Sequence, residues 1–281
     1  MADTSAPPRT KAPAGTCDCH LHIYGPRDEY PEAPTSPFPT PDAPVAAYRK
    51  VMARLGIERA VVVQPSAYGR DNRCTMDAVA ELGDIARAVV VVDTSTGDEE
   101  MERLTRGGAR AVRFHMLPGG VLPWDMLDEM AARVAEFGWH VQLQLDGRLL
   151  PEKRQQIERL PGRIVIDHTG KFLEPVAPTD PAFKVLLDLL DSGRCWVKLS
   201  APYETSKAGP PDYADVGALA SALIEAAPER MLWATNWPHP SAQKNPPDDA
   251  VMLDMLADWC EDETIRNRIL AVNPAEVYGF A

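Results

Sequence analysis

The chain has 281 residues, 45% of them hydrophobic, and can therefore bury a large core in one barrel-sized domain or in two smaller ones. Its formal net charge of −12 argues against nucleic acid or an anionic membrane as a partner, because both favour clustered Lys and Arg. The five cysteines are odd in number and lie mostly in apolar runs, as in a cytoplasmic protein with reduced thiols. No apolar run approaches the ~20 residues that cross a bilayer.

Residues 1–15 are rich in Pro, Ala, Ser and Thr without an apolar core, so we expect a disordered leader there and a single domain over residues 16–281. Eight short β-branched runs then alternate with amphipathic stretches, as in a parallel sheet connected by helices. The predicted strands are 16–22, 59–64, 87–92, 109–114, 140–145, 163–167, 195–199 and 231–235. The predicted helices are 45–55, 72–82, 98–106, 124–137, 151–160, 181–192, 215–226, 249–260 and 263–272.

Eight strand–helix units are the number that closes a (β/α)8 TIM barrel, which is the predicted α/β fold class. An open doubly wound sheet is the main alternative, but it usually carries a Gly-rich phosphate loop after its first strand, and none is present in this sequence. The proline-rich segment 31–44 follows the first predicted strand. It is equally compatible with an extended lip over the site and with a loose surface loop.

Histidines lie at the ends of several predicted strands. His20 and His22 share one face of the first strand, because alternate strand residues point the same way. Four of the six histidines lie at or just past a strand end, and they are His22, His115, His168 and His239. Imidazoles suit proton transfer and metal binding near neutral pH, so the pattern predicts a site at the C-terminal mouth of the barrel. We expect His239 to stabilise a turn first, and His140, at the opposite end, to be structural.

The fifth predicted strand alternates apolar and polar residues, with Val141 and Leu143 on one face and Gln142 and Gln144 on the other. A buried amide without partners costs a few kcal/mol, so we expect polar groups or a ligand inside the barrel. The same alternation points further polar side chains inward, namely Arg113, His115, His168, Lys198, Ser200 and Asn236. These residues predict a pocket for an anionic, hydroxyl-rich or ester-containing small molecule.

Six motifs carry a resemblance to a known family, and they are residues 18–26 (DCHLHIYGP), 63–65 (VQP), 112–114 (VRF), 138–141 (GWHV), 166–170 (IDHTG) and 235–240 (TNWPHP). In this order and spacing, from about Cys17 to Tyr278, the chain resembles the amidohydrolase superfamily. The similar branch contains the 2-pyrone-4,6-dicarboxylate lactonases and galactarolactone isomerases. The resemblance implies an amidohydrolase-type barrel and an enzyme acting on a small acidic lactone or an aldarate-type substrate.

Carried over by motif, His20 and His22 match the family's first-strand pair, His168 matches its sixth-strand histidine, and Arg113 matches the arginine that holds a substrate carboxylate. Metal-using members have a Lys or His on the fifth strand, where this chain has glutamines. The eighth-strand acid is replaced by Asn236, and an amide neither accepts a proton near neutral pH nor binds metal well. We therefore expect no cofactor. A zinc or other divalent ion, if bound, would use His20, His22 and His168.

The stretches 198–203 (KLSAPY) and 236–239 (NWPH) resemble the isomerase side of the branch. The predicted reaction is metal-independent lactone isomerisation by intramolecular acyl transfer. Its predicted catalytic residues are His20, His22, His168 and Asn236. In one assignment His168 is the base and the others donate to the oxyanion, but the sequence does not decide which histidine is the base. The predicted substrate-binding residues are Tyr24, Ser66, Asn72, Arg113, His115, Gln144, Lys171, Lys198 and Tyr203.

Three alternatives stay open at the level of sequence. One is a lactone hydrolase in which His168 activates water. Another is a zinc-dependent hydrolase or decarboxylase that uses the three histidines. The last is a sugar-acid binder that kept the barrel and lost its catalytic base.

Overall fold

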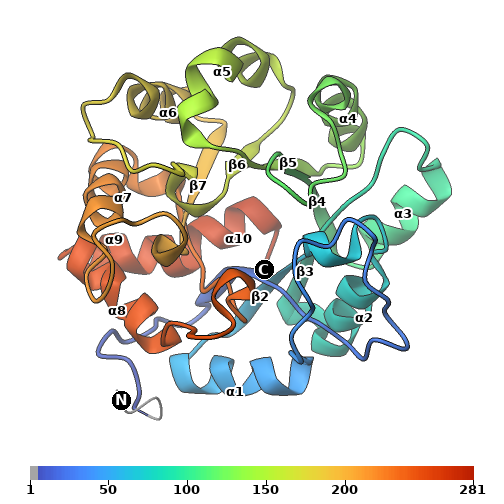
Figure 1. Ribbon diagram of the computed structural model, residues 1–281, viewed down its shortest axis with the longest axis horizontal. Helices are drawn as coiled ribbons and strands as arrows, with labels where there is room; N and C mark the ends of the chain where they lie inside the picture. The colour runs from blue at the N-terminus through green and yellow to red at the C-terminus, as the bar shows by residue number, and fades with distance from the viewer. Residues whose placement is uncertain (1–5) are drawn as a thin grey trace.

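The structure is a computed structural model, and it describes residues 6–281. Eight parallel strands form one sheet in sequence order, and the helices surround it (Figure 1). The strands are β1 (Cys17–Leu21), β2 (Arg59–Val63), β3 (Ala86–Val90), β4 (Ala109–His115), β5 (His140–Gln144), β6 (Ile164–Ile166), β7 (Cys195–Leu199) and β8 (Met231–Trp233). This arrangement confirms the predicted (β/α)8 barrel.

Each strand is followed by a helix that packs on the outside of the sheet. The helices are α1 (Val45–Leu55), α2 (Arg73–Leu82), α3 (Asp98–Arg106), α4 (Leu127–Glu136), α5 (Leu150–Arg159), α6 (Pro181–Asp191), α7 (Ala214–Ala226), α8 (Asp249–Trp259), α9 (Glu263–Asn267) and α10 (Asn273–Tyr278). The predicted bounds of α1 and α3 are confirmed. The last predicted helix, residues 263–272, is observed as the short helix α9 followed by a π-helical turn (Arg268–Val272), which leads into α10. Pro274 lies in the first turn of α10, where proline is tolerated.

Backbone hydrogen bonds join the C-terminal end of β1 to the segment that follows β8. The N–H of Asn236 donates to the carbonyl of His20 at 2.9 Å, and the N–H of His22 donates to the carbonyl of Trp237 at 2.8 Å. The register of β1 against β2 shifts between Asp18 and Leu21. Such irregularities re-aim side chains beside active sites, and this one accompanies the two histidines.

Asp18, which sequence reasoning did not single out, joins three elements on the outside of the barrel. Its carboxylate is fully buried and accepts hydrogen bonds from Thr235 N–H (3.0 Å), Thr235 Oγ1 (2.5 Å), Tyr48 Oη of α1 (3.0 Å) and His20 N–H (3.1 Å). Burial is the main reason that the pKa of Asp18 rises to about 6. The side chain therefore ties β1, α1 and the end of β8 together.

The strands separate two apolar cores. Val141 and Leu143 pack outward against the helices, as the alternation of β5 predicts. Inside the barrel, a smaller cluster includes Val165, Trp196 and Tyr278. Tyr278 of α10 is fully buried, and its ring centroid lies 5.3 Å from that of His140. The end of the barrel opposite the strand C-termini is thus sealed by α10, and His140 lies there as expected.

The described part of the expected leader, residues 6–15, contains no helix or strand but is not a free tail. The backbone N–H groups of Arg9 and Thr10 donate to the carboxylate of Asp254 in α8 at 3.0 and 2.7 Å. Residues 1–5 lie outside the described residues. The five cysteines are free and buried.

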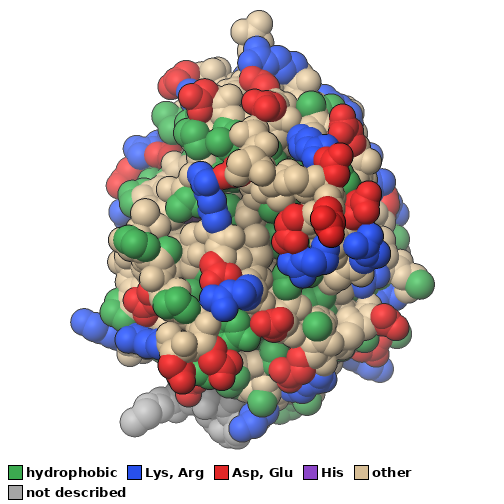
Figure 2. All heavy atoms as spheres, turned by 90° about the vertical axis from the view of Figure 1, so that its right-hand side faces the viewer, with side chains coloured by type: hydrophobic (Ala, Val, Ile, Leu, Met, Phe, Trp, Pro, Cys, Tyr) green, Lys and Arg blue, Asp and Glu red, His purple; other side chains and the backbone are tan. Residues whose placement is uncertain are grey.

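Basic and acidic side chains are interspersed on the face shown in Figure 2. Ion pairs within α3 and between α3 and α4 include Arg103 with Glu100 and Arg133 with Asp98. Among residues 6–281, no helix combines the length and apolar character needed to cross a membrane.

Candidate active site

A cavity of about 440 Å³ opens at the C-terminal ends of the strands. Most of the predicted site residues line it, and they are His22, Tyr24, Ser66, Arg113, His115, Gln144, His168, Lys171, Tyr203 and Asn236. Pro37 and Phe38 of the proline-rich segment also line it. A bridge between Tyr24 and Ala43 holds one end of that segment. The segment therefore forms a lip of the cavity rather than a loose loop.

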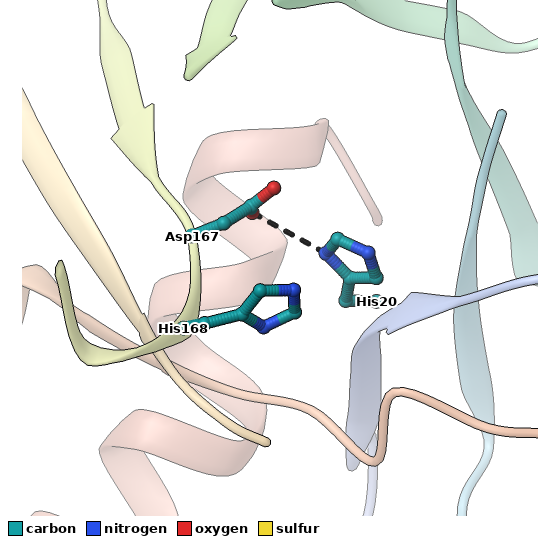
Figure 3. A group of neighbouring side chains, drawn as sticks. All are labelled: His20, Asp167 and His168. Atoms are coloured by element: carbon teal, nitrogen blue, oxygen red, sulfur yellow. Dashed lines mark hydrogen bonds and ion pairs between the residues drawn. The ribbon is translucent and has the colours of Figure 1, made fainter. Parts of the chain in front are cut away.

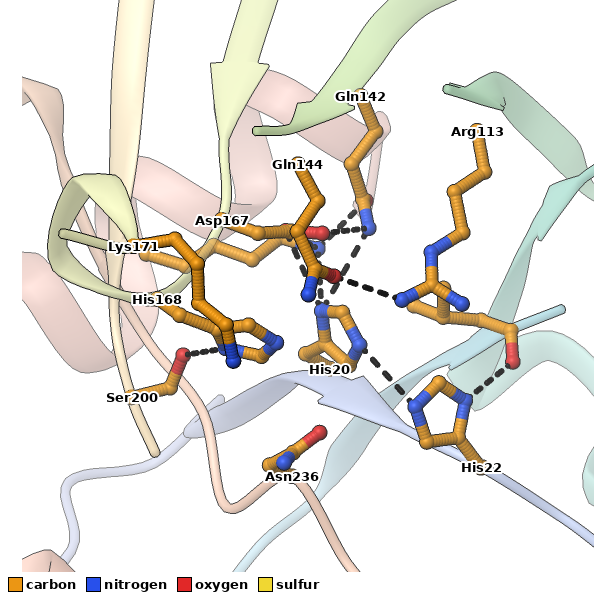
Figure 4. A network of polar contacts seen from close by, with 12 residues as sticks. His20, His22, Arg113, Gln142, Gln144, Asp167, His168, Lys171, Ser200 and Asn236 are labelled. Atoms are coloured by element: carbon orange, nitrogen blue, oxygen red, sulfur yellow. Dashed lines mark hydrogen bonds and ion pairs between the residues drawn. The ribbon is translucent and has the colours of Figure 1, made fainter. Parts of the chain in front are cut away.

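The first-strand histidines are hydrogen-bonded to one another (Figure 4). His22 Nδ1 lies 2.8 Å from the carbonyl oxygen of Val63, which can only accept, so this nitrogen carries the proton. Burial, and next the charge of Arg113, lower the pKa of His22 to about 3, so the ring is neutral and its Nε2 accepts. His20 Nε2, at 3.3 Å, must then be the donor. Both N–H groups of the pair are used within the protein.

Beneath this pair lies a buried ionic network that sequence reasoning did not foresee. Asp167, at the end of β6, accepts from Gln142 Nε2 at 3.0 Å and lies 3.4 Å from Lys198 Nζ. Lys198 Nζ also donates to Gln142 Oε1 at 2.5 Å and lies 3.4 Å from His20 Nδ1. Asp167 and Lys198 are both fully buried. Gln142 is thus satisfied by charged partners inside the barrel.

Three predicted site residues do not line the cavity. His20 lies behind His22, and Lys198 lies deeper in the barrel against Asp167. The amide of Asn72 donates to the carbonyl of Val91 and accepts from its N–H, both at 2.8 Å. Asn72 therefore ties the N-terminal end of α2 to the segment after β3, and its side chain has little hydrogen-bonding capacity left for a substrate.

His168 enters the cavity from a strained turn. The φ angles of His168, Thr169 and Lys171 are 54°, 54° and 50°, in the left-handed region that costs non-glycine residues about 1–2 kcal/mol each. The Nδ1 atom of His168 lies 2.8 Å from Ser200 Oγ. Burial, and then the neighbouring His20 and Lys171, keep the pKa of His168 well below its usual value. A neutral imidazole therefore faces the cavity, as a general base requires.

One end of the cavity is built around Arg113. Its guanidinium donates to the carbonyl of Gln64 at 2.7 Å and to Gln144 Oε1 at 2.8 Å, while Nε has no partner among the described residues. The hydroxyl of Tyr24 is likewise buried without a partner in residues 6–281. Burial, and then Arg113, lower the pKa of His115 to about 4. The donors still available to a ligand thus come from Arg113 and Tyr24 rather than from the histidine pair.

Glu204, in the turn after β7, is the acidic residue among the described residues that line the cavity. It forms an ion pair with Lys171 and accepts from Ser241 Oγ at 2.6 Å and from Asn236 Nδ2 at 3.3 Å. Burial lowers the pKa of Lys171 to about 7. Sequence reasoning missed Glu204 because it lies outside the strand alternation; its place five residues after the end of β7 was the available signal.

The amide of Asn236, just past β8, is not oriented as the predicted role of oxyanion donor requires. Its Nδ2 donates to Tyr203 Oη at 2.8 Å and to Glu204, so its donors are used inside the protein. Its Oδ1 is buried and has no partner among residues 6–281. The amide therefore presents an acceptor to a ligand, whereas a role in stabilising an oxyanion would need a donor.

Three buried residues have side chains of the types that bind metal ions. Ligand atoms of His20, Asp167 and His168 lie within 4.8 Å of one another (Figure 3). However, the ammonium of Lys198 lies 3.4 Å from both His20 Nδ1 and Asp167 Oδ1, and it already balances the carboxylate. In the alternative set of three histidines, the Nε2 atoms of His20 and His22 lie 3.3 Å apart and share a hydrogen bond. A divalent ion would have to displace the shared proton in order to use both lone pairs.

Comparison with known proteins agrees with this geometry. The amidohydrolase family model matches residues 17–280. D-galactarolactone isomerase of Agrobacterium fabrum is 37% identical over 96% of this chain and 93% of its own, and 2-pyrone-4,6-dicarboxylate hydrolase of Comamonas testosteroni is 34% identical over 96% and 92%. An apo crystal structure from Agrobacterium tumefaciens has 36% identity and a TM-score of 0.93, covering 98% of both chains. The chain therefore belongs to the amidohydrolase family, as its sequence motifs predicted.

Proposed function

We propose that this protein isomerises a small acidic lactone of the sugar-acid type by intramolecular acyl transfer, without a divalent metal. Two relatives that match nearly the whole chain are named for lactone substrates, one as an isomerase and one as a hydrolase. A substrate of this type has a carboxylate, hydroxyls and an ester. The cavity offers a cation, unpartnered polar atoms and a neutral imidazole for these groups.

The carboxylate binds at Arg113, whose remaining N–H groups are suited to paired hydrogen bonds with two oxygens. Lys171, which is ion-paired with Glu204, lines the same cavity. The hydroxyl of Tyr24, buried and without a partner in the described chain, donates to the carbonyl oxygen as it becomes negative. One donor of this kind is worth about 3 kcal/mol in the transition state.

His168 carries the proton. With its Nδ1 proton donated to Ser200, Nε2 takes the proton of the substrate hydroxyl while that oxygen bonds to the lactone carbonyl carbon. The old ring C–O bond then breaks, and His168 returns the proton to the departing oxygen. A nucleophile held within the same molecule has a high effective concentration, so less activation is needed than for water.

The observation that carries this proposal is the amide side chain of the residue that follows β8 at the cavity. An amide, Asn236, lies there with its acceptor toward the cavity, so a carboxylate base for water is missing at that position while His168 remains in place.

Incubation of purified protein with aldarolactones in ¹⁸O-labelled water tests the proposed isomerisation. We expect an unlabelled isomeric lactone, detected by NMR and mass spectrometry. Label in a ring-opened diacid as the first product would contradict isomerisation.

Hydrolysis is the second candidate, and one observation favours it. The carboxylate of Glu204 lines the cavity and is a possible base for water in place of the missing acid. Label incorporation that disappears in Glu204→Gln would support this reaction.

Metal independence is tested by elemental analysis and by activity after chelation. We expect substoichiometric metal and unchanged turnover, whereas activity lost with zinc and restored by zinc would support the metal-dependent alternative. Binding of lactones without any turnover would identify a sugar-acid binder.

A further inference from the structure

Four polar side chains form a hydrogen-bonded chain from α8 to the cavity. Asp249, the first residue of α8, lies with its Oδ1 3.0 Å from His239 Nε2. His239 Nδ1 lies 3.0 Å from Tyr203 Oη, which lies 2.8 Å from Asn236 Nδ2. The chain is almost entirely shielded from solvent, with His239 at 2% and Asn236 at 1% exposure. It connects a helix outside the barrel to a side chain that lines the cavity.

The direction of each hydrogen bond follows from the chemistry of its partners. The carboxylate of Asp249 accepts, so His239 Nε2 donates. With the ring proton on Nε2, Nδ1 is the acceptor for the hydroxyl proton of Tyr203, and the phenol oxygen is left to accept from the amide nitrogen of Asn236. The second proton on Nδ2 goes to Glu204 Oε1 at 3.3 Å, and Glu204 is itself held by Lys171 and Ser241.

This arrangement leaves the Asn236 amide one orientation. Turning it over would place its oxygen against the Tyr203 oxygen and the Glu204 carboxylate, which offer no proton to it. Its Oδ1 is therefore fixed on the cavity side, facing the histidines (Figure 4). This atom is buried and has no hydrogen-bond partner among residues 6–281. A buried acceptor without a partner favours a ligand that supplies a donor.

We propose that Asn236 determines specificity by accepting a hydrogen bond from one hydroxyl of the ligand, and that Asp249 and His239 are positioning residues that fix this acceptor through Tyr203. The inference rests on the proposed function for the ligand class, a hydroxylated sugar acid. A carboxylate at this place would be repelled by the amide oxygen, and an unsaturated ring diacid without hydroxyls would leave it unpaired. The chain of contacts thus selects polyhydroxylated acids over flat, unsaturated ones.

Calorimetric binding of galactarate and its monodeoxy analogues tests the proposal, because these open acids have no lactone to react. We expect the wild-type protein to lose ~10-fold in affinity when one particular hydroxyl is absent. Asn236→Gly, which suits the left-handed backbone at this position (φ 63°), is expected to bind both members of that pair equally. Equal binding of every analogue by the wild-type protein, or no binding of galactarate, overturns the proposal, as does unchanged discrimination in Asn236→Gly.

The roles of Tyr203 and Asp249 are tested by measuring the same ligand discrimination in variants of these residues. Tyr203→Phe and Asp249→Ala are expected to weaken the discrimination between the two ligands, and Asp249→Asn, which keeps an acceptor for His239, is expected to restore it. Asp254→Ala is the matched control, because this carboxylate of the same helix binds residues 9 and 10 instead. It should preserve the discrimination whatever its effect on melting temperature.

The two proposals can fail separately. Wild-type protein that discriminates in binding but isomerises no aldarolactone would refute the proposed function alone. Turnover of aldarolactones with equal affinity for all the deoxy analogues would refute this inference alone. Equal discrimination in Asp249→Ala and Asp254→Ala would assign Asp249 a purely structural role.

Discussion

At the scale of single residues, the contacts of Asn236 bear on which nucleophile the proposed reaction uses. Asn236 gives both amide protons to the protein and offers only an acceptor to the cavity. An aspartate there would add a group that takes a proton from water, and it would also lie against the carboxylate of Glu204.

We expect Asn236→Asp to produce ring-opened diacid that carries label from ¹⁸O water, while isomerisation falls by ~10-fold or more because the orienting contacts of the amide are lost. Mass spectrometry of early products measures both. Asn245→Asp, which adds the same charge to the loop after β8 but lies outside the main cavity, is the control and should not hydrolyse. Absence of label in the Asn236→Asp products would argue against water as the alternative nucleophile.

Lys198 and Asp167 illustrate how a buried charge depends on its partner. Both side chains are fully buried, and removing one member of such a pair typically costs 3–5 kcal/mol because the other charge remains without compensation. We expect Lys198→Met to lower the free energy of unfolding by about that amount in urea titrations.

The double variant Lys198→Met/Asp167→Asn provides the comparison, since it removes both charges. We expect it to recover most of the lost stability. Equal destabilisation of the single and double variants would show that Lys198 acts mainly through packing.

At the scale of elements, Asp18 makes the junction of β1, β8 and α1 sensitive to pH. Its pKa rises from 3.8 to about 6 on folding, so the folded state binds more protons than the unfolded state between those values. Stability contributed by this group therefore falls as pH rises from about 4 to 6, and the loss is complete above 6. The shift of about two units corresponds to up to about 3 kcal/mol.

Asp18→Asn should remove this cost without breaking the junction. The amide oxygen still accepts from the two backbone N–H groups, and the nitrogen can donate to the hydroxyls of Tyr48 and Thr235. We expect the variant to match the wild type near pH 3.5 and to become progressively more stable than it up to pH 6. Denaturant titrations across pH measure this, and a difference between the two proteins that is independent of pH would contradict it.

The sequence predicts the helices, the strands and the direction of their side chains better than it predicts how deep a side chain lies in the barrel. The bounds of α1 and α3 and the inward glutamines of β5 follow from periodicity, because side-chain alternation is a local property of the chain. Lys198 was predicted to bind substrate since it has the correct phase, but it lies one layer below the cavity. Position along a barrel strand relative to the cavity floor depends on strand tilt and register, which the sequence does not reveal.

Side chains from turns are harder still to foresee. Glu204 and Asn72 both lie outside the strands, where periodicity gives no direction, and only the first of them reaches the cavity. Asp167 follows its strand in the correct phase but adjoins the more conspicuous His168. Its importance emerges from Lys198 and Gln142, which come from β7 and β5 and are brought to it only by the fold.

For the molecule as a whole, α10 closes the end of the barrel opposite the cavity. Tyr278 fills the interior there, and its hydroxyl has no hydrogen-bond partner among residues 6–281. We expect Tyr278→Ala to lower the free energy of unfolding by about 3–5 kcal/mol through the cavity it creates.

Tyr278→Phe is the matched variant, because it keeps the ring and removes only the unpartnered hydroxyl. It should change stability by less than ~1 kcal/mol. Thermal or urea unfolding distinguishes the two, and a large loss in Tyr278→Phe would indicate that the hydroxyl is bound by water.

The hydrogen bond between Thr235 and Asp18 spans 217 residues, and it has a consequence for protein synthesis. The strand that carries His20 is synthesised well before the residues around Thr235, and until those residues emerge its edge lacks this neighbour. Unpaired strand edges are open to unwanted pairing. The first-strand histidines and Asn236 can come together only after that interval, so the cavity between them cannot form earlier.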